Sequence, residues 1–246
     1  MKSAHNKVTG AALLVTLGIV FGDIGTSPLY VISSILNKNL VTESLVYGGL
    51  SCIFWTLTLQ ATFKYVWITL QADNHGEGGV LSLFSLIKRT APRWTIYVAM
   101  LGCAALLADG MITPAISLTA SVEGLKTLND SVPVLPIVIV ILVGLFTFQQ
   151  FGTDKIGKSF GPIMLVWFSM LLILGFISLV EHPYVLKAIN PYYAYELLTA
   201  HPGAWVIIGA VFLSVTGAEA MYADLGHVGK TNIRITSGPV IEKPGD

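Results

Sequence analysis

The stretch "GIVFGDIGTSPLYV", residues 18–31, sets Asp23 between two glycines in an otherwise apolar run and follows it with Thr26, Ser27 and a proline. Glycine and proline weaken helical hydrogen bonding, and the two hydroxyl groups offer oxygen atoms. The pattern predicts a broken helix whose unwound carbonyl groups and carboxylate surround a desolvated cation. The alternative is a proline kink that the side chains of Thr26 and Ser27 repair.

The composition of the whole chain predicts an all-helical membrane protein. Hydrophobic residues make up 54% of the 246 residues and charged residues 11%, against about 25% charged residues in soluble domains. No strand-like alternation competes with the long apolar runs, so we expect one bundle of helices. Six stretches are long and apolar enough to cross a bilayer, namely residues 9–36, 46–70, 95–119, 134–151, 160–180 and 203–225.

The segments outside these spans are short and polar. The loop "ADNHGEGG", residues 72–79, is expected to be a glycine-rich turn rather than a metal site at His75 and Glu77. The following ten residues predict a short interfacial helix. From residue 230 no apolar run remains, so we expect a transmembrane domain over residues 1–229 and a disordered cytoplasmic tail over residues 230–246.

The distribution of basic residues predicts the orientation of the chain. The formal net charge is zero, which argues against a nucleic-acid partner. With a cytoplasmic amino terminus, ten basic residues fall inside, three fall outside, and Lys64 lies within the second span. The excess inside places both termini in the cytoplasm. The inner group is Lys2, Lys7, Lys88, Arg89, Arg93, Lys155, Lys158, Lys230, Arg234 and Lys243, and the outer group is Lys38, Lys126 and Lys187.

The third span carries a polar stripe. Asp109, Thr113 and Ser117 recur at four-residue spacing, so they lie along one face of a helix. Glu123 follows about four turns after Asp109, and we expect it near the outer mouth of the bundle.

The sixth span repeats the pattern of the first. In "SVTGAEAMYADLGH", residues 214–227, Thr216 and Glu219 stand three residues apart with Gly217 between them, which predicts a second broken helix. Three acids facing lipid, Asp23, Asp109 and Glu219, would cost on the order of 8 to 10 kcal/mol. They are therefore expected to face a protein interior or a wet cavity.

The chemistry of these groups favours a hard cation. Carboxylates, hydroxyls and carbonyls suit an alkali or alkaline-earth ion, and Cys52 and Cys103 lie within apolar spans with no paired histidines to complete a transition-metal site. Two interrupted spans with acidic residues are the sequence signature of a midplane site in inverted-repeat transporters. Removal from water favours the protonated carboxyl group, so proton exchange could couple to ion movement. No catalytic motif or cofactor signature appears, and an enzyme is not expected.

At these residues the chain resembles the KUP/HAK/KT family of potassium uptake permeases. The matching stretches run in order from residue 13 to about residue 229. The resemblance implies the amino-terminal half of a LeuT-like inverted-repeat fold with broken helices 1 and 6, in the cell (inner) membrane, and potassium entry by proton symport. The stretches are "GIVFGDIGTSPLYV", "ADNHGEGG", "DGMITPAIS", "SVEGL", "FQQFGTDKIGKSFGPIMLVWF", "NPYYA" and "VTGAEAMYADLGH".

The resemblance also implies roles for individual residues. Glu219 is implied as a charge or proton partner, and Asp23 and Asp109 are further candidates for the coupled proton. Direct coordination of potassium is implied for Asp23, Tyr30, Asp109, Thr113 and Thr216. Potassium ions, protons and lipid are then the expected partners, with no cofactor and no metal beyond potassium.

One departure from the family leaves alternatives open. Family members continue through about twelve spans, whereas this chain has six, and its tail leaves the family pattern after residue 229. A truncated, non-transporting fragment, or a subunit that needs a second copy or a carboxyl-terminal half, is therefore the main alternative. An amino-acid transporter of the same fold is less favoured, because the acidic residues disfavour an anionic group.

Overall fold

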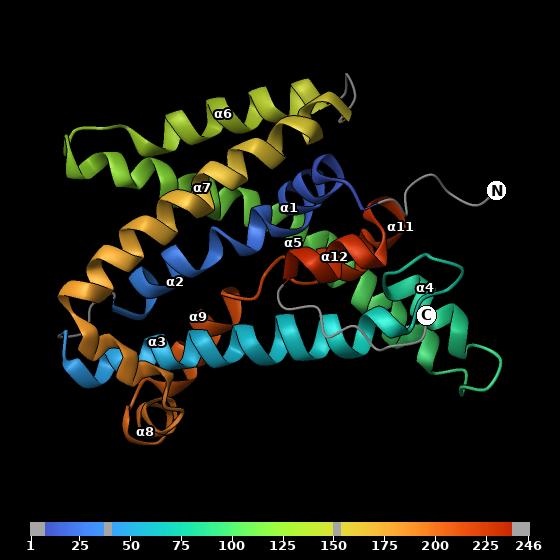
Figure 1. Ribbon diagram of the computed structural model, residues 1–246, viewed down its shortest axis with the longest axis horizontal. Helices are drawn as coiled ribbons and strands as arrows, with labels where there is room; N and C mark the ends of the chain where they lie inside the picture. Colours follow the sequence, from blue (N-terminus) through green and yellow to red (C-terminus); the bar gives the residue numbers. More distant parts are fainter. Residues whose placement is uncertain (1–7, 37–40, 150–153, 238–246) are drawn as a thin grey trace.

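The computed structural model describes residues 8–36, 41–149 and 154–237 (Figure 1). These residues form helices and turns, and their only β-type pairing is an isolated bridge between Asn74 and Glu77. The all-helical prediction is confirmed. The elements in chain order are α1 (Gly10–Ile24), α2 (Ser27–Leu36), α3 (Glu43–Leu57), the π-helix η2 (Thr58–Ile68), η3 (Thr69–Gln71), α4 (Val80–Ile87), α5 (Thr95–Glu123), η4 (Gly124–Thr127), α6 (Val134–Gln149), α7 (Asp154–Glu181), η5 (Pro183–Ile189), α8 (Tyr192–Ala200), α9 (Ala204–Leu213), α10 (Ala220–Ala223), α11 (Leu225–Val228) and α12 (Lys230–Ser237).

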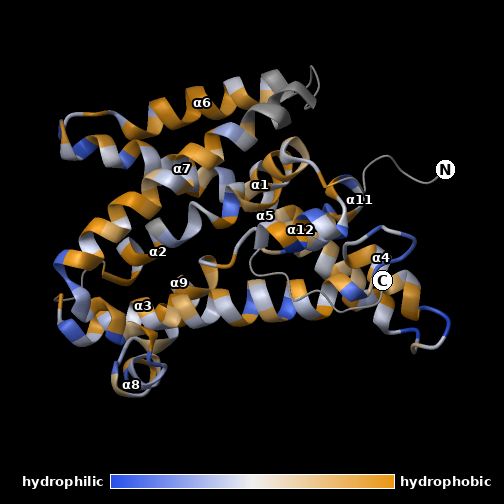
Figure 2. Cartoon of the chain, viewed as in Figure 1, coloured by the Kyte–Doolittle hydropathy of each residue, from blue (hydrophilic) through white to orange (hydrophobic). Residues whose placement is uncertain are grey.

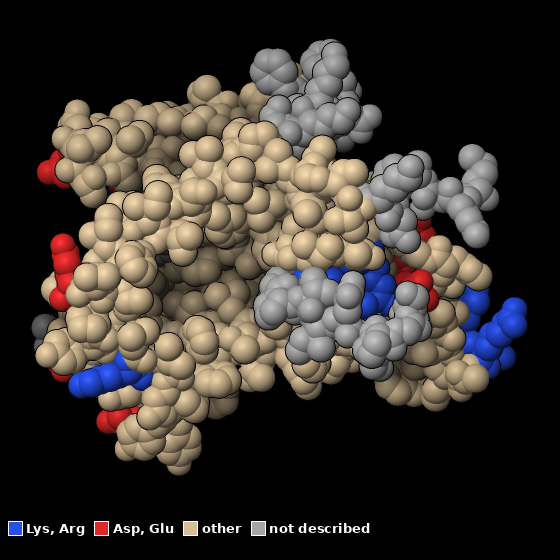
Figure 3. Space-filling view, in the orientation of Figure 1, with Lys and Arg blue, Asp and Glu red and all other residues tan. Residues whose placement is uncertain are grey.

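Each of the six apolar stretches contains helix. Among the described residues, three continuous helices are long and apolar enough to cross a membrane: Glu43–Gln71, Thr95–Thr127 and Phe160–Glu181. The other three stretches contain shorter apolar helices, and residues 150 and 151 of the fourth stretch lie outside the described part. Hydrophobic residues cover the long helices, and charged side chains gather toward the two ends of the long axis (Figures 2 and 3). The chain is a multi-pass membrane protein.

The first and sixth stretches are each divided into shorter helices. Thr9 caps α1, because its Oγ1 accepts a hydrogen bond from the backbone N–H of Ala12 at 3.1 Å. The helix ends at Ile24, and α2 begins after only two intervening residues. In the sixth stretch, six residues separate α9 from α10, and Gly217 among them has a φ of +89°. That left-handed backbone conformation strongly favours glycine.

Helix α7 packs directly on α1 (Figure 1). A Cβ atom added to Gly18 would lie 2.5 Å from the backbone nitrogen of Gly161, so the two helix backbones touch at these glycines. Close packing of this kind is typical of helix pairs in membranes, where small residues let backbones approach. The contact therefore fixes α1 against α7.

Two apolar clusters hold α1 and α2 on either side of Asp23. Val20 of α1 packs with Leu70 and Met221 in the first cluster, and Val31 of α2 packs with Ile207 in the second. The segment from Ile24 to Ser27 therefore lies between two cores, with its ends fixed by both.

The expected disordered tail is wrong for residues 230–237, which form α12. Ile233 is fully buried in the first cluster, and the side-chain amide of Asn232 donates a hydrogen bond to the carbonyl of Val228 at 2.7 Å. The few apolar residues of α12 do not form a run that would predict a membrane span. Burial of Ile233 in the first cluster nevertheless holds this short helix in place. Residues 238–246 lie outside the described part.

The loop over residues 72–79 docks on the carboxyl-terminal end of the sixth stretch and on the residues that follow it. The hydroxyl of Tyr222 donates a hydrogen bond to the carbonyl of Ala72, and Lys230 Nζ lies 3.6 Å from Asp73 Oδ1. The carboxylate of Glu77 lies against Gly226. The described residues contain no group of three histidines, cysteines or acids that could hold a metal ion. The predicted short helix after this loop is present as α4.

Candidate cation site

The two interrupted stretches meet at Asp23. A Cβ atom added to Gly217 would lie 2.6 Å from Asp23 Cβ and 2.8 Å from Asp23 Oδ2, so this carboxylate rests against the backbone between α9 and α10. Asp109 of α5 lies close enough to interact electrostatically with Asp23 and with Glu219. Three acids that lie far apart in the sequence therefore gather in one region, as the cost of exposing them to lipid required.

The polar stripe of α5 faces this region. Thr113 is buried, and its Oγ1 donates a hydrogen bond to Asp109 Oδ1 at 3.0 Å. One turn further on, Ser117 Oγ is shielded from solvent and has no hydrogen-bond partner among the described residues. Pro114 lies within α5 without ending it. The four-residue spacing therefore places three oxygen-bearing side chains along one face.

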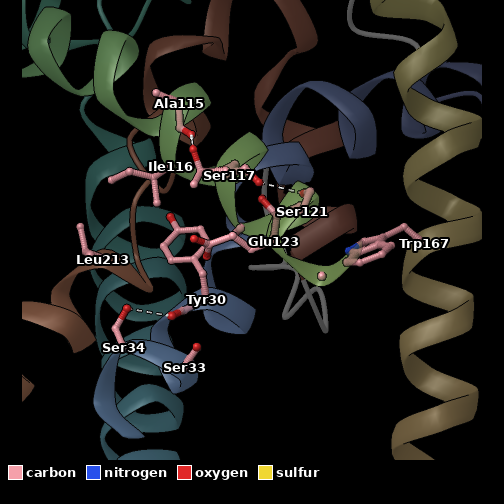
Figure 4. A pocket seen from close by; sticks show the side chains of 14 residues that line it. Tyr30, Ser33, Ser34, Ala115, Ile116, Ser117, Ser121, Glu123, Trp167 and Leu213 are labelled. Carbon is pink, nitrogen blue, oxygen red and sulfur yellow. Dashed lines mark hydrogen bonds between the residues drawn. The ribbon is translucent and has the colours of Figure 1, made fainter. Parts of the chain in front are cut away.

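Tyr30 points back toward the first interruption. Its hydroxyl donates a hydrogen bond to Ser27 Oγ at 3.0 Å, and Ser27 is fully buried. The same tyrosine lines a pocket of about 910 Å³, in which side chains of α2, α5 and α7 converge (Figure 4). Glu123 and Trp167 also line it, so the pocket extends along α5 from the polar stripe to the end of that helix.

Two carbonyl groups at the first interruption, those of Asp23 and Gly25, accept hydrogen bonds. Asp23 O accepts hydrogen bonds from Thr26 Oγ1 and Ser27 Oγ, both at 3.0 Å, and from Thr26 N at 3.1 Å. Gly25 O accepts a further bond from Trp167 Nε1 at 3.2 Å. At Asp23 the structure matches the alternative, a kink in which the two hydroxyls bond the backbone carbonyl. No hydrogen bond of the described residues ends on the carbonyl oxygen of Ile24, because Pro28, four residues further on, has no N–H. The carboxylate is the charged group that the first interruption offers a ligand.

The second interruption is open by comparison. No hydrogen bond of the described residues ends on the carbonyl oxygen of Ser214 or of Thr216. Thr216 itself is buried. Nor does any donor in the described part of the chain bond to the carboxylate oxygens of Asp23, which lie beside Gly217. Two backbone carbonyls and one carboxylate are thus left without donors in the same neighbourhood.

Two contacts of this site escaped the sequence reasoning. The approach of Gly217 to Asp23 and the hydrogen bond from Trp167 to Gly25 join residues 194 and 142 positions apart in the sequence. The sequence signal for the contact between Gly217 and Asp23 was the position of Gly217 at a predicted helix break. Asp224, at the end of the sixth stretch, lies 4.0 Å from the imidazole of His227.

The donor set defines what the site can do chemically. It consists of carboxylate, hydroxyl and carbonyl oxygens, which replace the hydration shell of a hard cation and do not suit soft metals. Acids beside one another also allow a proton to be shared between two carboxyl groups. The described residues of the site contain neither a nucleophile with a paired base nor a phosphate-binding loop.

Comparisons with known proteins agree with this donor set. Residues 10–241 match the family model described as "K+ potassium transporter integral membrane domain", so the match continues beyond residue 229, where we expected the family pattern to stop. The chain is 57% identical over 238 residues to the "Probable potassium transport system protein Kup" of Cytophaga hutchinsonii. It is 55% identical over 232 residues to the protein of that name from Flavobacterium psychrophilum, and 52% identical over 250 residues to the one from Clostridium perfringens.

The matched region covers most of this chain and a smaller share of each relative. It includes 94% to 96% of the chain but only 36% to 38% of the three relatives. No solved structure matches the chain.

Proposed function

The chain belongs to the K+ potassium transporter family, and on that premise we propose that it takes part in potassium uptake by proton symport, as the ion-binding portion of a Kup-type secondary transporter. The family and its named relatives are transport proteins, so the expectation that the chain is not an enzyme is confirmed. The observation that carries the proposal is the contact of the Asp23 carboxylate with the open backbone around Gly217.

Potassium is proposed to bind between the two interruptions. Asp23 supplies a charged ligand from α1, and Thr216 supplies oxygen from the second interruption, where its carbonyl has no donor. Asp109 and Thr113 approach from α5. Tyr30 completes the set by turning its hydroxyl away from Ser27, which it contacts here. These five residues are the ligands that the family resemblance implies.

Glu219 is proposed as the proton partner. Asp23, Asp109 and Glu219 carry three negative charges when all are ionised, and carboxylates at close range cannot all stay ionised without compensation. A potassium ion beside Asp23 and a proton shared by Asp109 and Glu219 would offset two of these charges. Each cation then stabilises binding of the other, which is what symport requires.

The proposed architecture follows from the same premise. The two interruptions are proposed to be the broken helices 1 and 6 of a LeuT-like inverted-repeat fold, in the inner membrane with both termini cytoplasmic. Alternating access in such a fold needs one repeat to move against the other. Partners that supply the second repeat, or a second copy of the chain, are therefore proposed to act with the residues described here.

The test is rubidium uptake in a potassium-transport-deficient bacterial strain that expresses the protein. Asp23→Asn keeps the shape of the side chain and removes its charge, and we expect uptake to fall about a hundredfold, since an ion pair of this kind contributes about 3 kcal/mol. Asp224→Asn is the control, because it makes the same change of side chain at an acid of the sixth stretch that contacts His227 instead. Equal uptake by the Asp23→Asn protein and the unaltered protein would refute the proposed site.

A second experiment separates transport from a fragment that only binds. The purified 246-residue chain is reconstituted in liposomes, and rubidium flux is measured with and without a proton gradient. Saturable flux that follows the gradient shows that the chain transports by itself. Absence of flux together with retained potassium binding shows that transport needs further residues or a partner.

A further inference from the structure

We propose that Gly217 is a positioning residue that sets where the Asp23 carboxylate meets the ion. The inference rests on the proposed function and assigns a role to a residue that makes no bond to potassium. Its basis is that the side chain of Asp23 occupies the space where any other residue at position 217 would place its Cβ atom: that atom would lie 2.6 Å from Asp23 Cβ, 2.8 Å from Oδ2 and 3.0 Å from Cγ.

Asp23 cannot move away from such a Cβ atom without cost. Its carbonyl is held by Thr26 and Ser27, which fixes the backbone at the end of α1. Two residues further on, α7 limits movement of the same backbone, because a Cβ atom on Gly25 would lie 2.5 Å from the ring of Phe168. The backbones of α1 and α7 also touch at Gly18. The side chain of Asp23 or the segment around Gly217 must therefore shift.

The backbone of Gly217 gives a second, independent constraint. Its φ of +89° leaves the carbonyl groups of Ser214 and Thr216 without helical partners. A residue with a side chain would favour a return to helical angles and so would close these carbonyls. Gly217 thus leaves the carbonyls of Ser214 and Thr216 without helical partners, and it also leaves room for the side chain of Asp23 beside its own backbone.

The test measures potassium binding to the purified chain through its thermal unfolding. Melting is followed over a series of potassium chloride concentrations, with choline chloride keeping the ionic strength constant. For Gly217→Ala we expect the concentration that gives half of the stabilisation to rise about tenfold, as Coulomb's law gives when one charge moves away by about 1 Å at an effective dielectric constant of about 20. Gly217→Asn tolerates positive φ but carries a Cβ atom, so we expect the same rise.

Two glycine variants serve as matched controls. Gly76 has a φ of +87° with open space around its Cβ position, so Gly76→Ala adds backbone strain without the contact. Gly209 lies in α9 and also faces open space, so Gly209→Ala adds a methyl group to the same stretch without strain. Both controls are expected to keep the half-maximal potassium concentration of the unaltered chain, although Gly76→Ala lowers the melting temperature in choline.

Asp23→Asn in the same assay separates this inference from the proposed site. If Asp23→Asn abolishes the potassium response and both Gly217 variants bind like the unaltered chain, the positioning role is wrong and the site stands. If Asp23→Asn keeps the full response, or the unaltered chain shows none, the site and the positioning role both fail. If Gly217 acts only by positioning the charge of Asp23, the double variant Asp23→Asn with Gly217→Ala binds potassium no more weakly than Asp23→Asn alone.

Discussion

The backbone between α1 and α2 and the backbone between α9 and α10 arise from similar sequences and end in different states. Both combine an acid, a hydroxyl residue and glycine within a few positions. At the first, Gly25 has a φ of −73°, two residues separate the helices, and hydroxyl and indole groups donate to the carbonyls of Asp23 and Gly25. At the second, Gly217 has a φ of +89°, six residues separate the helices, and two carbonyls have no donor among the described residues.

Glycine content does not by itself open a helix. The first interruption has Thr26 and Ser27 three and four residues after the acid, where their side chains reach back to the carbonyl of Asp23. In the second, Ser214 precedes the turn and its hydroxyl donates back to Val211 at 2.6 Å, so it cannot cover the carbonyls that follow. The first region therefore offers a carboxylate beside two bonded carbonyls, and the second offers the carbonyls of Ser214 and Thr216, on which no hydrogen bond of the described residues ends.

The largest effect is expected from Glu219→Gln, at the end of the open interruption. An amide cannot take up the coupled proton, so rubidium uptake should fall about a hundredfold, within the usual range for loss of a proton-transfer group. The remaining uptake should no longer rise as the external pH is lowered. Uptake is measured over a series of external pH values, with Glu181→Gln as the control on an exposed acid. A pH dependence that survives Glu219→Gln would assign the proton to another acid.

The next effect tests whether the open interruption binds the ion. Thr216→Val keeps the shape of the side chain and removes its hydroxyl, and we expect the rubidium concentration at half-maximal uptake to rise about tenfold, or about 1.4 kcal/mol. The maximal rate should change less. An unchanged half-maximal concentration would mean that Thr216 contributes no more than its backbone carbonyl.

A smaller effect on stability is expected at the closed interruption. Trp167→Phe removes the donor to the carbonyl of Gly25, which should cost about 1 kcal/mol of unfolding free energy and lower the melting temperature by about 2 to 4 °C. Trp205→Phe is the control, because Trp205 is 84% exposed. A rise in potassium affinity on Trp167→Phe would show that the freed carbonyl of Gly25 can bind the ion. The first interruption would then also supply a backbone ligand, against the difference described above.

The smallest effect is expected from Thr26→Val. The carbonyl of Asp23 keeps two other donors, Ser27 Oγ and Thr26 N, so the loss should be about 0.5 kcal/mol of unfolding free energy. The half-maximal rubidium concentration should stay within about twofold of the unaltered value. If Thr26→Val instead matches the effect of Thr216→Val, the two interruptions serve the ion equally and the distinction between them is lost.

The sequence predicted the class of fold and the gathering of the acids because both follow from the cost of burying charge in an apolar layer. Asp109 and Thr113 were paired correctly, since helical spacing alone sets their contact. The state of the first interruption was not predictable, because Thr26 supports both a free and a repaired backbone. The helix α12 was missed because its burial depends on a groove formed by distant residues around Ile233.

The docked loop over residues 72–79 has a mechanical consequence. The hydroxyl of Tyr222 donates a hydrogen bond to the carbonyl of Ala72, and Lys230 pairs with Asp73. The carboxylate of Glu77 contacts Gly226, which lies between Tyr222 and Lys230 in the sequence. The carboxyl-terminal end of the sixth stretch is thereby joined to the loop that follows the second stretch. A tilt of the sixth stretch that pivots at Gly217 would therefore pull on the loop over residues 72–79 as well.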